Sequence, residues 1–202
     1  MAAKLALSGG PRVRTSPFPS WPVSGEAEEH ALVKVLRSGQ WGRHMGRQVA
    51  TFEQDFAAYQ EAEYGIAVMN GSVALRIALL AAGLQAGDEV IVPPYTFIAT
   101  ATSVVEANGI PIFVDIAPDT YCLDPDKIEA AVTSRTRAII PVHFAGQAAD
   151  MDRIMAIARK YNLVVIEDAA HAHGAEYKGR RHGRRTTRRA WTTDLYCWVC
   201  QR

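Results

Sequence analysis

The sequence predicts an α/β fold in which a mainly parallel sheet is flanked by helices. Three observations lead to this prediction. Short apolar segments alternate with longer amphipathic segments between residues 64 and 167, which is typical of repeated β-α units. Polar or glycine-containing motifs follow three of the apolar segments, where an open parallel sheet has its ligand-binding edge. With 202 residues, 49% of them hydrophobic, the chain is long enough to bury one sizeable core.

Each element follows from its local pattern. Residues 1–25 are rich in proline and glycine, which predicts an extended arm. The predicted helices are Glu26–Arg37, Val49–Tyr59, Ser72–Leu84, Phe97–Ala107, one that begins at the N-cap Asp124 with Pro125 in its first turn, and Met151–Tyr161. The predicted strands are Tyr64–Met69, Glu89–Pro93, Ile110–Asp115, Thr136–His143 and Leu163–Glu167.

The charge distribution separates the carboxyl end from the rest of the chain. The formal net charge is +1, but residues 179–202 contain seven Arg and one Asp, so the first 178 residues carry a net charge of −5. We therefore divide the chain into an extended arm at 1–25, a domain at 26–183 and an aberrant Arg-rich tail at 184–202.

Cysteine usage and hydropathy predict a cytoplasmic protein. Two of the three cysteines, Cys197 and Cys200, lie in the tail, so no disulfide framework is indicated and a reducing compartment is expected. The amino end lacks the apolar region of a signal peptide, and no apolar run reaches the ~18–20 residues that span a bilayer. We expect no membrane partner.

The segment Asn70-Gly71-Ser72 leads from a predicted strand into a predicted helix. Backbone N–H groups at a helix start, together with a hydroxyl, bind anions, and Gly71 lets a ligand approach the backbone closely. Ser72 is also compatible with a plain N-cap, which is the commoner role of serine there. The motif is not a dinucleotide fingerprint, because further glycines are missing, and not a P-loop, because no Gly-Lys-Ser/Thr follows.

Aromatic residues mark a second strand end, Pro93-Pro94-Tyr95-Thr96-Phe97. Either Phe97 or Tyr95 suits stacking against a planar ring. The alternative for a lone phenylalanine is a core position, which is the more common one.

The third strand end carries Asp168, directly after the apolar run from Leu163 to Ile166. A desolvated carboxylate needs a cationic partner or hydrogen-bond donors, and the protonated ring nitrogen of a cofactor supplies one. The alternative is an aspartate that caps the following turn. His171 suits a phenolic oxygen or a phosphate, or else a structural role, and His143 and Gln147 are further candidates for the same crevice.

Together these strand ends match one ligand, a planar phosphorylated ring with a basic nitrogen. The phosphate would bind at Gly71 and Ser72, the ring face at Phe97 and the ring nitrogen at Asp168. Pyridoxal phosphate has this chemistry.

These residues belong to segments in which the sequence resembles the DegT/StrS-type sugar aminotransferases, which are fold-type-I pyridoxal phosphate enzymes. The resemblance runs from about Leu5 to about Gly183. It rests on Asn-Gly-Ser-x-Ala-Leu, Gly-Asp-Glu-Val-Ile-Val-Pro, Tyr-Thr-Phe-Ile-Ala-Thr, Pro-Ile-Phe-Val-Asp-Ile, Pro-Val-His-Phe-Ala-Gly-Gln and Glu-Asp-Ala-Ala-His-Ala-His-Gly-Ala. The amino end, Gly-Gly-Pro-x-Val-Arg-Thr-x-Pro-Phe-Pro-x-Trp-Pro, is similar to the branch that acts on keto-cyclitols and related keto-sugars.

The resemblance implies a fold-type-I large domain and a role for each candidate residue. Gly71 and Ser72 match phosphate-binding positions, Phe97 matches the aromatic that stacks on the ring, Asp168 matches the carboxylate that pairs with the pyridinium, and His171 matches a position near the cofactor's 3′ oxygen. The implied reaction transfers an amino group from glutamine or glutamate to a keto-sugar or keto-cyclitol, with the cofactor ring as electron sink. A homodimer is implied for full-length members.

The sequence departs from the family at the lysine that binds the cofactor covalently and transfers protons. The family has this lysine roughly 25–30 residues beyond the aspartate, as an activated nucleophile. That window contains Trp191–Trp198, with Tyr196 near the lysine position, and Lys178 is the last lysine of the chain. We therefore expect no catalytic residue here and a fold that is incomplete at its carboxyl end, because of a truncated or frameshifted reading frame.

Two functions follow from this departure. One is the aminotransferase of the family, and the other is a non-catalytic remnant that at most holds the cofactor loosely. The tail adds two alternatives: its Arg cluster is compatible with nucleic-acid binding, and Cys197 with Cys200 is compatible with zinc, although a structural zinc site needs four ligands. We expect neither a nucleic-acid partner nor a metal.

Overall fold

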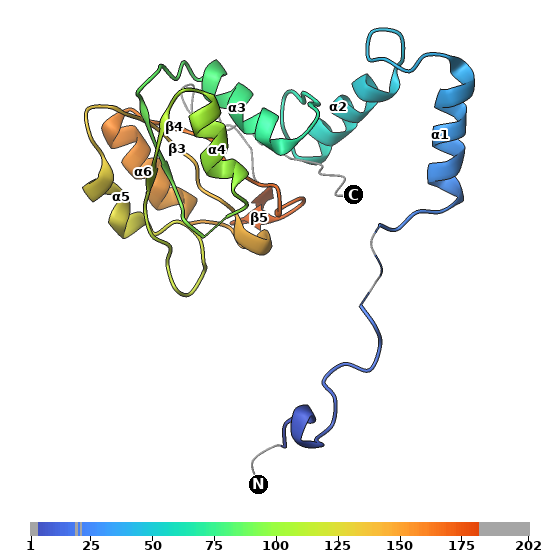
Figure 1. The fold of residues 1–202 in the computed structure, drawn as a ribbon, viewed down its shortest axis with the longest axis horizontal. Coiled ribbons are helices and arrows are strands. Elements are labelled where there is room, and N and C mark those ends of the chain that lie inside the picture. Colours follow the sequence, from blue (N-terminus) through green and yellow to red (C-terminus); the bar gives the residue numbers. More distant parts are fainter. Residues whose placement is uncertain (1–3, 19, 21, 182–202) are drawn as a thin grey trace. The chain divides into compact units, whose positions relative to one another are not determined.

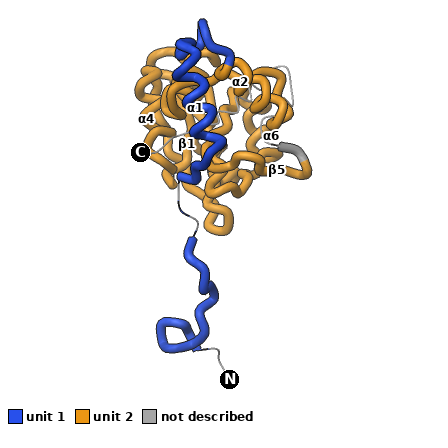
Figure 2. Tube along the Cα trace, turned by 90° about the vertical axis from the view of Figure 1, so that its right-hand side faces the viewer, with its two compact units in different colours: residues 1–47 blue, residues 48–202 orange. Residues whose placement is uncertain are grey.

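The computed structural model describes residues 4–181 with the exception of Pro19 and Trp21 (Figure 1). The predicted tail at 184–202 lies outside the described residues. The chain divides into two compact units, residues 1–47 and residues 48–202 (Figure 2). The first unit therefore includes the helix that we assigned to the main domain, and the domain boundary at residue 26 stays a prediction.

The first unit contains a short 3-10 helix, η1 (Ala6–Ser8), and one α-helix, α1 (Glu26–Ser38). The side chain of Glu28 accepts a hydrogen bond of 2.8 Å from the backbone N–H of Gly25, which caps the helix start. Gly39 ends α1 with a φ of 67°, a left-handed conformation that glycine adopts without steric cost. Helix α1 is confirmed as predicted, to within one residue.

The second unit holds the predicted α/β fold. Its helices are α2 (Gln48–Tyr59), α3 (Gly71–Ala81), α4 (Ala99–Glu106), α5 (Pro125–Ala131), the 3-10 helix η2 (Phe144–Gly146) and α6 (Met151–Tyr161). Its strands are β1 (Glu89–Val92), β2 (Ile110–Phe113), β3 (Thr136–Ile139) and β4 (Val164–Val165), followed by a small antiparallel hairpin of β5 (Glu176–Tyr177) and β6 (Arg180–Arg181). Strands β1 to β4 form one parallel sheet in the order β2-β1-β3-β4, so the predicted fold class is confirmed.

Helices cover both faces of this sheet because successive strand residues point to opposite sides. In β1, Val90 and Val92 pack in one cluster with Leu79 of α3 and Val104 of α4. Ile91 of the same strand packs in the other cluster, which α5 and α6 complete. Figure 1 shows α5 and α6 side by side over that second face.

A buried carboxylate holds the edge of the sheet where the strands begin, which we call the amino edge. Glu89 opens β1 and is 2% exposed. It accepts a hydrogen bond from the hydroxyl of Thr133 and one of 2.9 Å from Nε of Arg135. The Thr133 hydroxyl, followed by the Arg135 guanidinium, holds the pKa of the Glu89 carboxyl below its usual value. The loop that enters β3 is thus tied to the start of β1.

The strand predicted at Tyr64–Met69 is wrong, because the segment has no strand assignment. Tyr64, Ile66 and Met69 are 78%, 77% and 79% exposed, so the apolar residues of this run do not enter the core. The backbone N–H of Ala67 donates instead to the side chain of Glu53, at 2.8 Å. A strand needs a neighbouring strand for its backbone groups, and no described segment pairs with this one.

The strands predicted at Thr136–His143 and Leu163–Glu167 are shorter than expected. The ladder between them ends at Ile139 and Val165, and Pro141 follows, which has no N–H to donate. Backbone pairing resumes after Pro141. The backbone N–H of Asp168 donates to the carbonyl of Pro141 at 2.9 Å, and the backbone carbonyl of Asp168 accepts from the N–H of His143 at 3.1 Å. These bonds hold the backbone of Asp168 against the end of β3.

Within the described part of the chain, no helix is both long and apolar enough to cross a membrane.

Candidate functional site

The candidate site lies where strands β1 to β4 end, which we call the carboxyl edge of the sheet. Four connections leave this edge: residues 93–98 after β1, 114–124 after β2, 140–150 after β3 and 166–175 after β4. Helix α3 leads into β1 through a short connection, so its first turn lies toward the same edge.

The first turn of α3 is capped by Asn70. The side-chain oxygen of Asn70 accepts a hydrogen bond of 2.9 Å from the N–H of Val73, so Asn70 is the N-cap and Ser72 is not. Ser72 therefore lies inside the first turn, where its hydroxyl makes no hydrogen bond to any described residue. Leu75, one turn later, is buried in the cluster that contains Ile166 of the segment leading to Asp168. This packing brings the Gly71-Ser72 turn toward the carboxyl edge.

Asp168 is 8% exposed, and its carboxylate has two described donors. The Thr100 hydroxyl donates to Oδ2 at 2.8 Å, and the backbone N–H of Ala170 donates to Oδ1 at 3.3 Å. The second bond is the turn cap that we considered as an alternative. The turn cap therefore exists together with a tertiary hydrogen bond. A role as a turn cap does not exclude a role as a partner for the ring nitrogen of a cofactor.

Phe97 precedes Thr100 by one helical turn and lies outside the core. The Phe97 carbonyl accepts the N–H of Thr100 at 3.1 Å, so the ring is attached one turn away from the hydroxyl that binds Asp168. The Phe97 side chain is 70% exposed, and the core position considered for it is wrong. An exposed aromatic ring is open to stacking against a planar ligand.

Tyr95 and His171 belong to a different aromatic group. Tyr95 lies 4.8 Å from the Phe144 ring and 5.5 Å from the Tyr121 ring, measured between centroids. His171 contacts Phe144 edge-on at 6.2 Å. Each of the four connections at the carboxyl edge contributes one ring to this group. Tyr95 is thus in contact with other rings, whereas Phe97 contacts no ring of the described residues.

His143, a further candidate, is fully buried and does not face the crevice. Its Nε2 lies 2.9 Å from the Glu167 carboxylate, and its Nδ1 accepts the backbone N–H of Ala149 at 3.2 Å. Because Nδ1 accepts, the neutral ring carries its proton on Nε2 and donates it to Glu167. The pair joins the connection after β3 to the residue that precedes Asp168. Gln147 is exposed and donates to the neighbouring carbonyl of Ala148.

We expect His143→Phe to lower the free energy of unfolding by about 2–4 kcal/mol, because two buried groups each lose a hydrogen-bond partner. Urea unfolding followed by circular dichroism measures the change. His30→Phe, at an exposed position of α1, is the matched control and should change stability by less than about 0.5 kcal/mol. Equal stabilities of the two variants would contradict a stabilising role for the His143–Glu167 pair.

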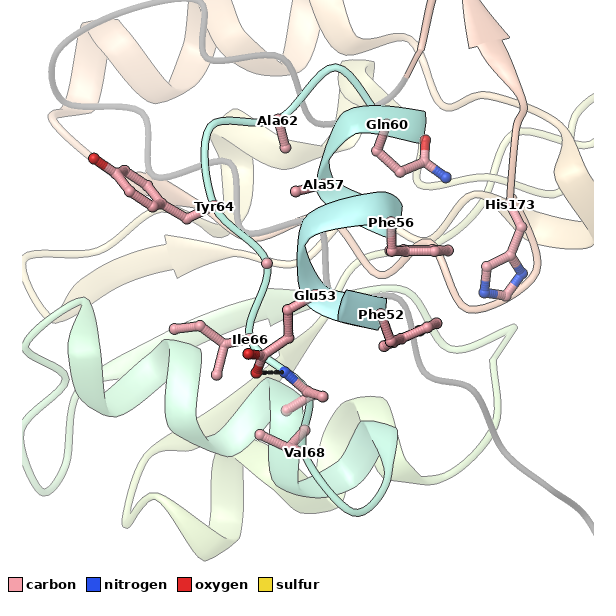
Figure 3. Close-up of a pocket in the computed structure, with 13 residues that line it drawn as sticks. Phe52, Glu53, Phe56, Ala57, Gln60, Ala62, Tyr64, Ile66, Val68 and His173 are labelled. Atoms are coloured by element: carbon pink, nitrogen blue, oxygen red, sulfur yellow. Dashed lines mark hydrogen bonds between the residues drawn. The ribbon is translucent and has the colours of Figure 1, made fainter. Parts of the chain in front are cut away.

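A pocket of about 90 Å³ lies between α2 and residues 62–68 (Figure 3). Phe52, Phe56 and His173 line one side of it. Burial, and secondarily the charge of His171, lower the pKa of His173. The Gln60 amide is buried beside the pocket, with no hydrogen-bond partner among the described residues. Neither Asp168 nor Phe97 lines this pocket.

Thr100 is a residue of the candidate site that the sequence analysis missed. Thr100 was quoted only as part of a motif, although its place in the first turn of a helix after Phe97 indicates that it faces the same strand ends. Among the described residues, no group of three or more His, Cys, Asp or Glu side chains is placed to hold a metal ion.

Comparison with known proteins identifies the family. Residues 22–190 match the DegT/DnrJ/EryC1/StrS aminotransferase family. The chain belongs to this family. A relative from Streptomyces kanamyceticus, L-glutamine:2-deoxy-scyllo-inosose aminotransferase, is 43% identical over 187 residues, which are 90% of this chain and 44% of the relative. The chain thus spans less than half the length of that relative.

Two solved structures superimpose on the chain at more than 40% sequence identity. The crystal structure of 3-amino-5-hydroxybenzoic acid synthase matches with a TM-score of 0.80 and 44% identity, over 82% of this chain and 43% of the other. The structure of NtdA from Bacillus subtilis with bound cofactor PMP matches with a TM-score of 0.73 and 41% identity, over 80% of this chain and 38% of the other. The predicted resemblance to pyridoxal phosphate aminotransferases is therefore confirmed.

Proposed function

We propose that the carboxyl edge of this sheet is the cofactor-binding part of a pyridoxal phosphate-dependent aminotransferase. The transferred amino group would come from glutamine or glutamate and go to a keto-sugar or keto-cyclitol. The observation that carries the proposal is the buried Asp168 carboxylate, held by Thr100 one turn from the exposed ring of Phe97. The amino donor and keto-cyclitol acceptor are supported by the name of the Streptomyces kanamyceticus relative.

The residues present suit pyridoxal phosphate by their chemistry. A carboxylate offers about four acceptor positions, and described donors use two of those on Asp168, so the carboxylate can still accept from a protonated ring nitrogen. The Ser72 hydroxyl and the first-turn N–H groups of α3 suit a phosphate. Phe97 offers its face to the ring, and His171 offers a donor. When bound, the cofactor supplies an electron sink for the charge that develops on the amino donor.

The second candidate function is binding of the cofactor without catalysis. The ion pair of Lys178 with Asp152 favours it. The Lys178 ammonium forms this ion pair and lies 5.3 Å from the Tyr177 ring. The hydrogen bond to Asp152 raises the pKa of Lys178. A lysine must be neutral to attack a carbonyl, so this ion pair works against covalent cofactor binding at Lys178.

Isothermal titration calorimetry of the chain with pyridoxamine phosphate tests the proposed function. Pyridoxamine phosphate needs no covalent lysine and therefore reports the non-covalent contacts alone. We expect saturable one-to-one binding that inorganic phosphate weakens by competition at α3. Absence of saturable binding by a folded chain would contradict the proposed site. The homodimer that the resemblance implies stays a prediction.

We expect borohydride reduction of the chain with pyridoxal phosphate to leave no single labelled lysine. Exposed lysines react slowly and without preference, since their ammonium groups are protonated at neutral pH. Peptide mass spectrometry after reduction locates any adduct. Selective labelling of Lys178 at stoichiometric cofactor would contradict the expectation. Lys127 serves as an internal control, because it also forms an ion pair, with Asp115 at 3.1 Å.

A further inference from the structure

We propose that Thr100 is a positioning residue that fixes the orientation of the Asp168 carboxylate, and that Thr96 completes the hydrogen-bonded chain behind it. The inference deepens the proposed function and rests on it for the identity of the ligand. Thr100 does not touch that ligand in the proposal; it acts through Asp168.

The geometry determines which group donates and which accepts in each of these hydrogen bonds. Thr100 is 1% exposed, and its Oγ1 lies 2.8 Å from Asp168 Oδ2 and 2.7 Å from Thr96 Oγ1. A hydroxyl has one proton, and an ionised carboxylate has none to give, so Thr100 donates to Asp168. Thr96 must then donate to Thr100. Each donor polarises the next, which strengthens the final bond to the carboxylate.

A threonine in a helix has a local alternative that Thr100 does not take. Serine and threonine side chains in helices commonly bond a backbone carbonyl of the preceding turn. Ser103 on the same helix does so, donating to the carbonyl of Thr100 at 3.1 Å. The Thr100 hydroxyl instead bonds a side chain 68 residues away in the sequence. It thereby links α4, which follows β1, to the segment after β4.

The consequence is a carboxylate fixed at both oxygens. Thr100 holds Oδ2 and the N–H of Ala170 holds Oδ1, so rotation of the Asp168 side chain would break both bonds. A carboxylate that is already oriented loses less conformational entropy when it accepts a ring nitrogen. We therefore expect removal of the Thr100 hydroxyl to weaken ligand binding without removing any contact to the ligand.

The test compares Thr100→Val, which removes the hydroxyl at nearly constant volume, with Thr100→Ser, which keeps it. Thr102→Val is the matched control, because Thr102 lies on the same helix, is half-buried and makes no side-chain hydrogen bond within the described chain. The first readout needs no ligand: the carboxyl ¹³C resonance of Asp168, assigned with Asp168→Asn. We expect it to move in Thr100→Val and to stay in Thr100→Ser and Thr102→Val. An unmoved resonance in a folded Thr100→Val chain would overturn the proposal.

The second readout uses pyridoxamine phosphate labelled with ¹⁵N in the ring. We expect Thr100→Val to weaken its binding roughly fivefold, about the worth of one hydrogen bond, and to move the ring ¹⁵N shift toward the unprotonated value. Thr100→Ser should restore both. If the parent chain binds no pyridoxamine phosphate, the proposed function fails, and the ligand-free resonance still decides the role of Thr100. Unchanged affinity and ring shift in Thr100→Val, with binding intact, would overturn the proposal.

Discussion

The purified 202-residue chain, mixed with pyridoxal phosphate, glutamine and a keto-cyclitol, is expected to show no appreciable transamination. No lysine follows Lys178 in the sequence, and Lys178 itself is paired with Asp152. We therefore expect no neutral amine of this chain to be positioned to move a proton at the carbon of the amino donor. Positioned acid–base catalysis typically contributes about 10²–10⁴-fold, and poorer orientation of the reactants increases the loss.

The measurement is a coupled assay for the keto acid formed from glutamine. A chimera that joins residues 1–183 to the part of the Streptomyces kanamyceticus relative that follows its aligned segment is the positive control, since the aligned segment is 44% of the relative. We expect the chimera to turn over and the 202-residue chain to stay at the rate of free cofactor. Comparable rates for the two proteins would show that another group of this chain performs the proton transfer.

Asp168→Asn is expected to weaken pyridoxamine phosphate binding by about 10–100-fold, because a charge-assisted hydrogen bond to the ring nitrogen is worth about 1.5–3 kcal/mol. The substitution keeps the shape of the side chain and an acceptor for Thr100, but it removes the negative charge that holds the proton on the ring. Calorimetric titration of the variant and the parent chain measures the difference.

Asp115→Asn is the matched control for this prediction. Asp115 also follows a strand of the parallel sheet, but its side chain is 65% exposed and pairs with Lys127. We expect this variant to bind pyridoxamine phosphate like the parent chain. A similar loss in both variants would indicate a general effect of net charge and would count against a specific contact of Asp168 with the ring.

The elements that the sequence predicted well are those that local signals determine. Helix α6 has the predicted bounds, because the Asp150 side chain caps its start and Asn162 ends it with a φ of 55°. The N-cap Asp124 is likewise confirmed, as its side chain accepts from the N–H of Asp126 at 3.0 Å. In both cases the deciding hydrogen bond joins residues within one helical turn.

Long-range contacts explain what the sequence did not predict. The apolar run at Tyr64–Met69 has strand composition, but a strand forms only beside a partner, and composition does not reveal the partner. Asp168 was located from its place after an apolar strand, whereas its bond to Thr100 crosses 68 positions and leaves no local pattern. The same applies to the pairing of His143 with Glu167, which turned a candidate for the crevice into a buried structural contact.

The parallel sheet carries buried carboxylates at both edges, Glu89 where the strands begin and Glu167 and Asp168 where they end. Among the residues that the structure describes, the side chains of Thr133, Arg135 and Thr136 donate hydrogen bonds to Glu89, whereas one side-chain hydroxyl donates to Asp168. For protein engineering, this difference in the number of partners distinguishes regions that tolerate substitutions from regions that do not. A library in the connections 93–98, 114–124 and 144–150 would change ligand recognition and leave the Glu89 contacts intact. The same number of changes in 133–136 would loosen the attachment of β3 to β1 and lower the yield of folded protein.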